Sequence, residues 1–304
     1  MLARPLRLPL AVAVSGAVLV TGSGCGGEAP RDSSDDAALA DRARQVAGAW
    51  DGSPAATAWR AGYHPTGETV RPPRGGLRGR ADERAFEDGR FVLRGKLPGP
   101  GPRDGWVRWP GERALARPLV GADESYRSLA VSRAAAAEEP HLTVTRVERG
   151  EMRVATSRGP ATVPAWLYTL DGYASPLKQA AVHPSKPPRP PIGRARDLPG
   201  LPLEQLVGTT ADGRAVTVIA LHGACDDGAV VKALETDGSV VLTPSVEKRD
   251  RDDDALCTSQ AEMQRVTVEL DRPVGERVLL DTLTGRPVPY KDMRGSKGVR
   301  GTTP

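Results

Sequence analysis

Apolar residues recur every three or four positions near the start of the chain. Between residues 35 and 50 these positions hold Leu39, Ala43, Val46, Ala47 and Trp50. The spacing places all of them on one face of a helix, so we predict an amphipathic helix over Asp35–Trp50. Ser34 can cap its start, and Gly52-Ser53-Pro54 supplies residues that end it.

A strand pattern replaces the helical repeat from residue 86 to residue 170. Short runs that are apolar or alternate in polarity predict strands at Phe86, Phe91–Leu93, Trp106-Val107, Leu142–Val144, Met152–Ala155 and Val163–Leu170. One helix is predicted over Asp123–Ala136. The residues from Thr156 to Pro160 predict a tight turn between the last two of these strands.

Residues 203–290 show the same strand pattern and predict a compact β unit. The expected strands are Ala215–Leu221, Ala229–Thr236, Ser239–Ser245, Gln264–Leu270 and Arg277–Asp281. Asp212-Gly213 and Asp237-Gly238 favour the two-residue turns of β-hairpins.

A proline-rich segment separates the two strand regions. His183–Pro202 holds seven prolines in twenty residues, a composition typical of a stiff, extended linker. We therefore predict an α+β fold, predominantly antiparallel β, with two β-rich units after an N-terminal amphipathic helix. The expected boundaries are an N-terminal domain over 37–183, a linker over 184–202, a C-terminal domain over 203–290 and a disordered tail over 291–304.

The first residues of the chain have the pattern of a secretory signal peptide. Arg4 and Arg7 precede an almost wholly apolar run over Leu8–Val20, and small residues follow it. This run is too short to span a bilayer as a helix, which needs about 20 apolar residues. We expect residues 1–24 to be removed.

Cleavage after residue 24 would leave Cys25 at the new N-terminus. Ser23 and Gly24 fit the small positions before a lipid-modified cysteine, whereas Gly22 stands where an aliphatic residue is usual. We predict that Cys25 carries a diacylglyceryl thioether with acyl chains such as palmitate, followed by a flexible tether over 25–36. The alternative is an ordinary signal peptide that leaves Cys25 as a spare thiol.

Composition narrows the classes of partner. Without residues 1–24 the chain keeps 40 basic and 38 acidic side chains, so it offers no strong positive field for nucleic acid. Its remaining length suits one large or two modest domains. We expect a monomer whose partners are the membrane, through Cys25, and an unidentified ligand or envelope protein.

The two other cysteines, Cys225 and Cys257, follow strands in turn-like sequence. In an oxidising compartment such a pair predicts a disulfide bond. The alternative is a reactive Cys225 activated by His222. No third group that would orient this pair is evident, and its spacing matches no nucleophile pattern.

No metal or cofactor site is predicted. The histidines His64, His141, His183 and His222 are scattered without the spacing of zinc ligands. The acidic residues near the cysteines could hold Ca²⁺, but basic residues interleave with them and the EF-hand spacing is absent, which favours solvated loops. These residues are Asp226, Asp227, Asp250, Asp252, Asp253 and Asp254.

Catalytic motifs are missing as well, so we assign no catalytic residue. The sequence contains no GxSxG elbow and no glycine-rich phosphate loop.

The five tryptophans could stack on sugars, but with two phenylalanines in the chain they are needed as core volume. Trp106 and Trp109 should face opposite sides of one strand.

Three segments resemble secreted lipoproteins of high-GC Gram-positive (actinobacterial) bacteria. They are TSRGPATVPAWLYTLDG at 156–172, HGACDDG with LETDGSVV and CT within 222–258, and VTVELDRPVGERVLLDTLTGRPV at 266–288. The resemblance covers most of residues 140–290 and implies the lipidated N-terminus and the Cys225–Cys257 pair. That group has no assigned activity, so no active site carries over.

These observations favour a membrane-anchored extracytoplasmic lipoprotein that is not an enzyme and presents a binding surface or an interdomain groove. One alternative is an extracellular hydrolase acting on a cell-wall or secreted substrate, which would need a pocket with a histidine, a serine and a carboxylate. A second alternative is an accessory subunit of a membrane complex, which would expose a large apolar patch.

Overall fold

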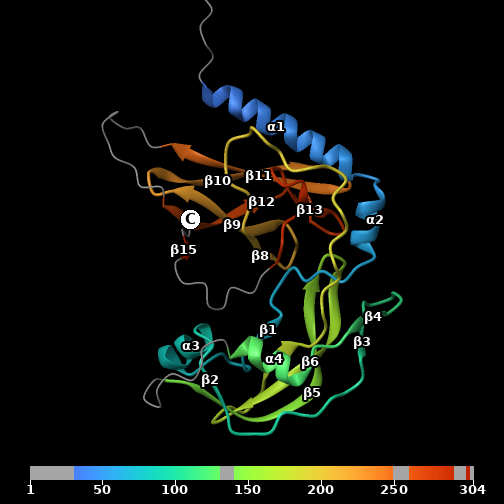
Figure 1. Ribbon diagram of the computed structural model, residues 1–304, viewed down its shortest axis with the longest axis vertical. Helices are drawn as coiled ribbons and strands as arrows, with labels where there is room; N and C mark the ends of the chain where they lie inside the picture. The colour runs from blue at the N-terminus through green and yellow to red at the C-terminus, as the bar shows by residue number, and fades with distance from the viewer. Residues whose placement is uncertain (1–30, 131–139, 249–259, 291–298, 302–304) are drawn as a thin grey trace, which may run out of the picture.

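The two strand regions form two units, which lie one above the other in Figure 1. The computed structural model describes residues 31–130, 140–248, 260–290 and 299–301. Strands predominate among these residues, most of their pairings are antiparallel, and four helices accompany them. The predicted fold class, α+β with predominantly antiparallel β, is confirmed.

The lower unit is built on a five-stranded sheet in the order β1-β7-β6-β5-β2. Its strands are β1 (Val70–Arg71), β2 (Phe91–Leu93), β5 (Leu142–Thr156), β6 (Gly159–Leu170) and β7 (Leu177–Ala180). β2 and β5 pair in parallel, whereas the other described strand pairs of this sheet are antiparallel. The long β5–β6 hairpin closes where Thr156 pairs with Gly159, as the predicted turn requires.

Two helices and a second hairpin cover this sheet. The helices α3 (Gly79–Glu87) and α4 (Ala122–Leu129) contribute to an apolar core around Tyr168 and Leu177. The hairpin of β3 (Asp104–Val107) and β4 (Leu115–Pro118) packs near the β5–β6 turn. The rest of the predicted helix, residues 131–136, lies outside the described residues.

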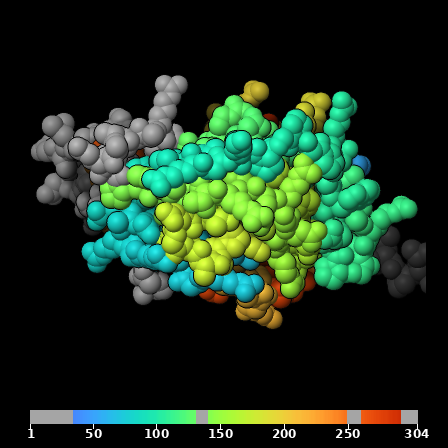
Figure 2. All heavy atoms as spheres, turned by 90° about the horizontal axis from the view of Figure 1, so that it is seen from below, coloured from blue at the N-terminus to red at the C-terminus, as the bar shows by residue number. Residues whose placement is uncertain are grey.

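Glycines allow the segment after β2 to cross the sheet closely. A Cβ atom at Gly95 would lie 2.3 Å from the carbonyl oxygen of Thr145, and one at Gly105 would lie 2.8 Å from the Pro164 ring. Figure 2, seen from below, shows this segment lying across β5 and β6. Side chains at these glycines would force the segment away from the sheet.

The upper unit is a sandwich of two four-stranded sheets. One has the order β10-β11-β13-β14 and the other β15-β12-β9-β8. The strands are β8 (Gln205–Thr209), β9 (Ala215–Gly223), β10 (Asp226–Glu235), β11 (Ser239–Lys248), β12 (Ala261–Glu269), β13 (Val278–Asp281), β14 (Arg286–Pro287) and β15 (Val299–Gly301). Alternate residues from both sheets meet in one buried core that includes Val218, Leu242 and Val268. β15 falls within the tail that we expected to be disordered.

The predicted amphipathic helix is α1 (Arg31–Trp50), and all five predicted apolar residues are buried. It begins before Ser34, so Ser34 is not its cap, and the expected tether over 25–36 overlaps its first turns. Its apolar face and that of α2 (Pro54–Arg60) pack on β11 and β13 of the upper unit. The predicted N-terminal domain over 37–183 includes this helix, but the apolar side chains of α1 contact Val241 and Leu280 of the upper unit instead.

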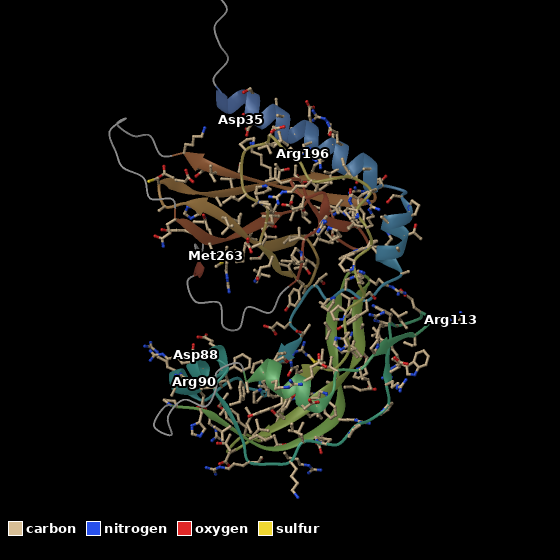
Figure 3. All side chains as sticks on the ribbon, in the orientation of Figure 1. Asp35, Asp88, Arg90, Arg113, Arg196 and Met263 are labelled. Carbon is tan, nitrogen blue, oxygen red and sulfur yellow. The ribbon has the colours of Figure 1, made fainter. Side chains whose placement is uncertain are left out.

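The proline-rich linker returns the chain from the lower unit and then runs over the upper one. It forms no helix or strand, and the amide of Ala195 donates to the carbonyl of Leu283 (2.7 Å). Arg42 of α1 donates to the carbonyl of Gly193. In Figure 3 Arg196 of the linker lies beside α1. The upper unit thus contains both the beginning and the end of the described chain, and residues 62–185 are inserted into it.

Replacing Trp50 tests the packing of α1 on the upper sheet. The Trp50 side chain is fully buried and its Nε1 donates to the carbonyl of Gly285 (2.8 Å). We expect Trp50→Ala to lower the free energy of unfolding by about 3–5 kcal/mol, measured by urea denaturation of the full chain. The matched control is Trp106→Ala on β3, which is 55% exposed and should change that free energy by less than about 0.5 kcal/mol. Equal effects of the two substitutions would contradict this packing.

Candidate functional site

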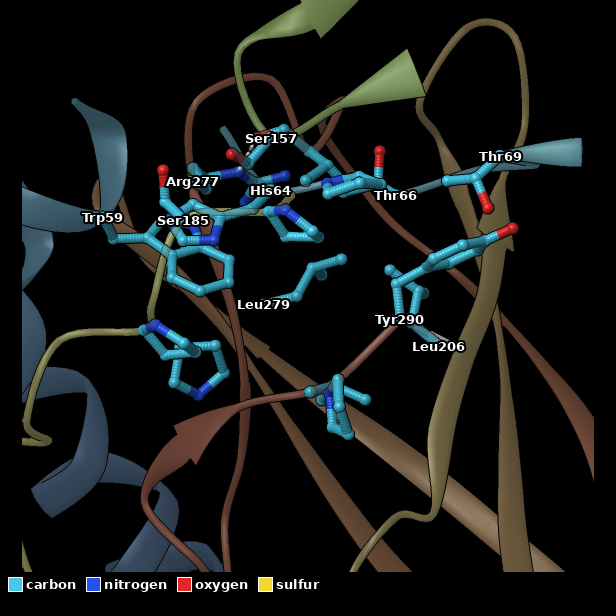
Figure 4. Close-up of a pocket in the computed structure, with 17 residues that line it drawn as sticks. Trp59, His64, Thr66, Thr69, Ser157, Ser185, Leu206, Arg277, Leu279 and Tyr290 are labelled. Atoms are coloured by element: carbon cyan, nitrogen blue, oxygen red, sulfur yellow. Dashed lines mark hydrogen bonds between the residues drawn. The ribbon is translucent and has the colours of Figure 1, made fainter. Parts of the chain in front are cut away.

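A cavity of about 320 Å³ lies where the two units meet (Figure 4). Trp59, His64 and Ser185 stand along one side of it, and Leu206 and Tyr290 along the other. Its wall combines residues from the α2 end, the β5–β6 turn, the linker and the upper sheets: Trp59, His64, Pro65, Thr66, Thr69, Ser157, Pro184, Ser185, Pro187, Leu206, Val274, Arg277, Leu279, Pro287, Val288, Pro289 and Tyr290.

Three other hollows are somewhat larger, at 410–450 Å³, but they have fewer features of a ligand site. Two of them flank α1, where Lys232 and Asp36 already form an ion pair (2.8 Å). The third lies beside β5 and β7 of the lower sheet and is lined largely by charged side chains. The cavity between the units differs from all three because its wall contains buried polar atoms without partners.

The two chain segments that cross between the units run side by side at this cavity. The amide of Tyr63 donates to Ser185 Oγ, and the amide of Ser185 donates to the carbonyl of Tyr63, both at 2.8 Å. The β5–β6 turn is fixed to the same place, because the amide of Ser157 donates to the carbonyl of His64 (2.9 Å). A third bond runs from the amide of Thr66 to the carbonyl of Ala155 (2.9 Å). These bonds hold Ser157 and His64 in the cavity wall.

The His64 ring is stacked on Trp59, with the ring centroids 3.7 Å apart and the planes 4° from parallel. The close approach of Gly62 fixes the ring on its other side, because a Cβ atom there would lie 2.4 Å from His64 Nε2. Burial, together with the positive charge of Arg117, lowers the pKa of His64 to about 4. The imidazole is therefore neutral at pH 7.

Several polar atoms in and behind the cavity wall are buried without a hydrogen-bond partner among the described residues. They are Ser157 Oγ and His64 Nε2 in the wall and the Tyr63 hydroxyl behind it. Burial also raises the pKa of Tyr63, so this hydroxyl stays protonated. A buried polar group without a partner costs about 1–3 kcal/mol, which a ligand or water with a matching group can recover. Of the three, His64 Nε2 is packed against Gly62 and the Tyr63 hydroxyl lies behind the wall, which leaves Ser157 Oγ as the candidate for a ligand contact.

Arg277 is the charged member of the described cavity wall, and its guanidinium is already occupied. It is 8% exposed and forms an ion pair with Glu235 (2.7 Å). Its other hydrogen bonds go to the carbonyls of Arg272, Pro273, Val274 and Thr236, at 2.6–3.4 Å. These five bonds match the five N–H groups of an arginine side chain. The role of Arg277 is to hold the 272–277 loop against β10.

The hydrolase hypothesis needs a carboxylate beside the histidine and a serine. His64, Ser157 and Ser185 line the cavity, but the described lining residues include no aspartate or glutamate. The low pKa of His64 also makes it a weak general base at neutral pH. This cavity does not supply the arrangement that hypothesis requires.

The predicted lipidation and disulfide residues lie largely beyond the described ranges. Cys25 and Cys257 fall outside them, and Cys225 lies in the turn between β9 and β10. In that turn Asp226 accepts a hydrogen bond from the amide of Gly223 (2.6 Å). The lipid anchor and the Cys225–Cys257 bond therefore remain predictions.

The other residues that the sequence singled out are dispersed over the fold. His222 is the next-to-last residue of β9, and its Nδ1 lies 2.9 Å from the carbonyl oxygen of Gly223. His183 lies in the linker region, 3.9 Å from a Glu124 carboxylate oxygen. No group of three potential metal ligands occurs among the described residues, and Asp250–Asp254 lie outside them.

Trp109 is 4% exposed and Trp106 55% exposed, as expected for opposite orientations, but Trp109 lies two residues beyond the end of β3 and so does not share that strand with Trp106. The tryptophans other than Trp106 are buried and serve as core volume. The remaining exposed large apolar residues in the described chain are Leu201 in the linker and Met263 on β12. Figure 3 labels Met263. These three residues lie on different elements of the described chain.

Sequence reasoning missed His64 and Ser157 as cavity residues. His64 has no neighbour at a ligand spacing, and Ser157 stands in a segment that indicates only a turn. The one local signal is Gly62, whose side-chain position the His64 ring occupies. The contact between Gly62 and the His64 ring can be recognised only in the folded structure.

Comparisons of the chain with protein-family models, with curated proteins and with solved structures find no match. Among the described helices, none combines the length and the apolar character needed to cross a bilayer. The cavity geometry therefore provides the strongest basis for a functional proposal.

The low pKa of His64 predicts how stability depends on pH. The unfolded chain binds a proton at this imidazole near pH 6.5, whereas the folded chain binds it only near pH 4. The stability contributed by the neutral, buried ring is thus present above pH 6.5 and lost as the pH falls toward 4. We expect His64→Phe, which keeps a ring on Trp59, to lose less free energy of unfolding between pH 7 and pH 5 than the wild type. Equal losses in urea denaturation would show that His64 does not titrate in this way.

Proposed function

We propose that this protein is a membrane-anchored extracytoplasmic lipoprotein that binds a ligand in the cavity between its two units. The observation that carries the binding role is the Ser157 hydroxyl, which is buried in an otherwise largely apolar wall without a partner. Ligand sites commonly have this composition, with few polar groups in an apolar cavity between two units.

Binding agrees with the rest of the wall better than catalysis does. The guanidinium of Arg277 is saturated, and His64 is neutral and packed against Gly62. Neither group is poised to transfer a proton or to stabilise a developing charge. What remains is a shaped apolar surface with one buried hydroxyl.

The anchoring part of the proposal rests on the sequence pattern of residues 1–25. The tether from Cys25 to α1 would be short, because α1 begins at Arg31. The apolar face of α1 is buried against the upper sheet, so this helix is not available to insert into a membrane. Two acyl chains on Cys25 would supply stable attachment, since each buried methylene contributes about 0.8 kcal/mol.

The intact mass of the protein purified from its native membrane tests the anchor. We expect the mass of residues 25–304 plus the diacylglyceryl group with its two acyl chains, and a further 2 Da gained on reduction of the Cys225–Cys257 bond. A Cys25→Ser variant should retain the uncleaved chain and lack the lipid mass. An unlipidated wild-type mass would overturn the anchor, and an unchanged mass on reduction would overturn the disulfide.

A substitution that fills the cavity tests the binding role. Thr66 lines the cavity and is half-buried, so Thr66→Trp should occupy the space with little damage to the fold. We expect the full chain to bind the uncharged fluorescent probe N-phenyl-1-naphthylamine, and Thr66→Trp to weaken that binding at least tenfold.

The matched control is Thr57→Trp, which places the same side chain on an exposed position of α2 outside the cavity. It should bind the probe as the wild type does. Equal binding by wild type and Thr66→Trp, or no binding by the wild type, would contradict the proposed site.

A further inference from the structure

We infer that the ligand of this cavity is an uncharged, largely apolar ring compound that carries one hydrogen-bonding group. The inference rests on the proposed binding function and specifies the chemical class of the ligand. Three properties of the wall lead to it: the saturation of its cation, the neutrality of its histidine and the abundance of side chains that carry a ring.

The cavity offers no free charge to an anion. All five N–H groups of Arg277 are used, one of them in the ion pair with Glu235. An anionic ligand would have to displace Glu235 or a backbone carbonyl and leave that group unpaired in a buried place. The charge of Arg277 is therefore already compensated within the protein.

A cation would be equally unfavoured. The described wall holds no carboxylate that could pair with it. The His64 ring is neutral at pH 7 and its Nε2 faces Gly62, so it provides no compensating charge. Moving an unpaired charge from water into such a wall costs several kcal/mol or more.

The shape of the wall favours flat rings. Eight of the lining residues carry a ring: Trp59, His64, Pro65, Pro184, Pro187, Pro287, Pro289 and Tyr290. Aromatic and prolyl faces give large contact areas to a planar apolar molecule at little cost in side-chain entropy. The volume of about 320 Å³ is at the lower end of ligand pockets, which range over about 300–1,000 Å³.

Ser157 supplies the buried polar group of the wall that we assign to the ligand contact. Its Oγ is buried without a partner, and its backbone amide is already bound to the carbonyl of His64. A hydroxyl or carbonyl on the ligand would satisfy this atom. The hydroxyl of Ser185 is less available, because it already accepts from the amide of Tyr63.

Three compounds of equal size and different charge test this inference at pH 7: 2-naphthylmethanol, 2-naphthoate and 2-naphthylmethylamine. Each competes with N-phenyl-1-naphthylamine for the full chain. We expect the neutral alcohol to bind at least tenfold more tightly than the anion and the cation. Binding of 2-naphthoate or 2-naphthylmethylamine as tight as that of the alcohol would overturn the inference.

The role of Ser157 is tested with Ser157→Ala and with 2-methylnaphthalene, which lacks the hydroxyl. The substitution should weaken binding of 2-naphthylmethanol by about three- to tenfold and leave 2-methylnaphthalene unchanged. An equal change for both compounds would show that Ser157 does not provide the polar contact.

The two proposals fail in different ways. In one case Thr66→Trp weakens binding of the probe while the neutral, anionic and cationic naphthyl compounds compete equally well. The binding function then stands and the inferred ligand class is wrong. If the full chain binds no probe at all, the proposed function itself is overturned.

Discussion

The packing of α1 and α2 on the outer face of β11 and β13 determines the path of the whole chain. Val46 and Trp50 are fully buried against this sheet, and Trp50 also bonds to the turn between β13 and β14. The first helices are therefore part of the same unit as the last strands. Residues 62–185 therefore leave the upper unit, form the lower one, and return the chain to the upper unit.

The chain leaves and returns at one place, which explains why the cavity lies there. The reciprocal bonds between Tyr63 and Ser185 join the outgoing and returning segments. The β5–β6 turn reaches the same junction through Ser157. Loops from three directions cannot satisfy every polar atom where they meet, and the unpartnered Ser157 Oγ lies at this point. Local exceptions of this kind are common at functional sites.

The parts of the fold that could be predicted from sequence depend on near neighbours along the chain. Alternation of apolar residues indicates β9 and β11, and Asp212-Gly213 and Asp237-Gly238 mark the turns that precede them. The apolar stripe of α1 likewise predicts its buried face. The sheet that covers this face could not be predicted. An amphipathic helix can pack on any apolar sheet surface, and the spacing of its apolar residues does not show which distant strands it will contact.

The cavity could not be predicted for a similar reason. Its wall is assembled from residues between Trp59 and Tyr290, and no local spacing connects them. In the sequence, the residues around His64 indicate only an ordinary loop. The low pKa of His64 arises from its burial and from the nearby Arg117, which are set by the folded structure. The saturation of Arg277 likewise depends on Glu235, 42 positions earlier.

The insertion of residues 62–185 into the upper unit sets an order for events during synthesis. About 190 residues separate the end of α1 from the start of β11. At about 5–20 residues per second a ribosome needs roughly 10–40 s to make them. The lower sheet is complete within this interval, whereas the apolar stripe of α1 has no sheet to cover it. The first helix of this protein therefore belongs to the unit that is completed last, because its apolar face has no partner until β11 and β13 have emerged.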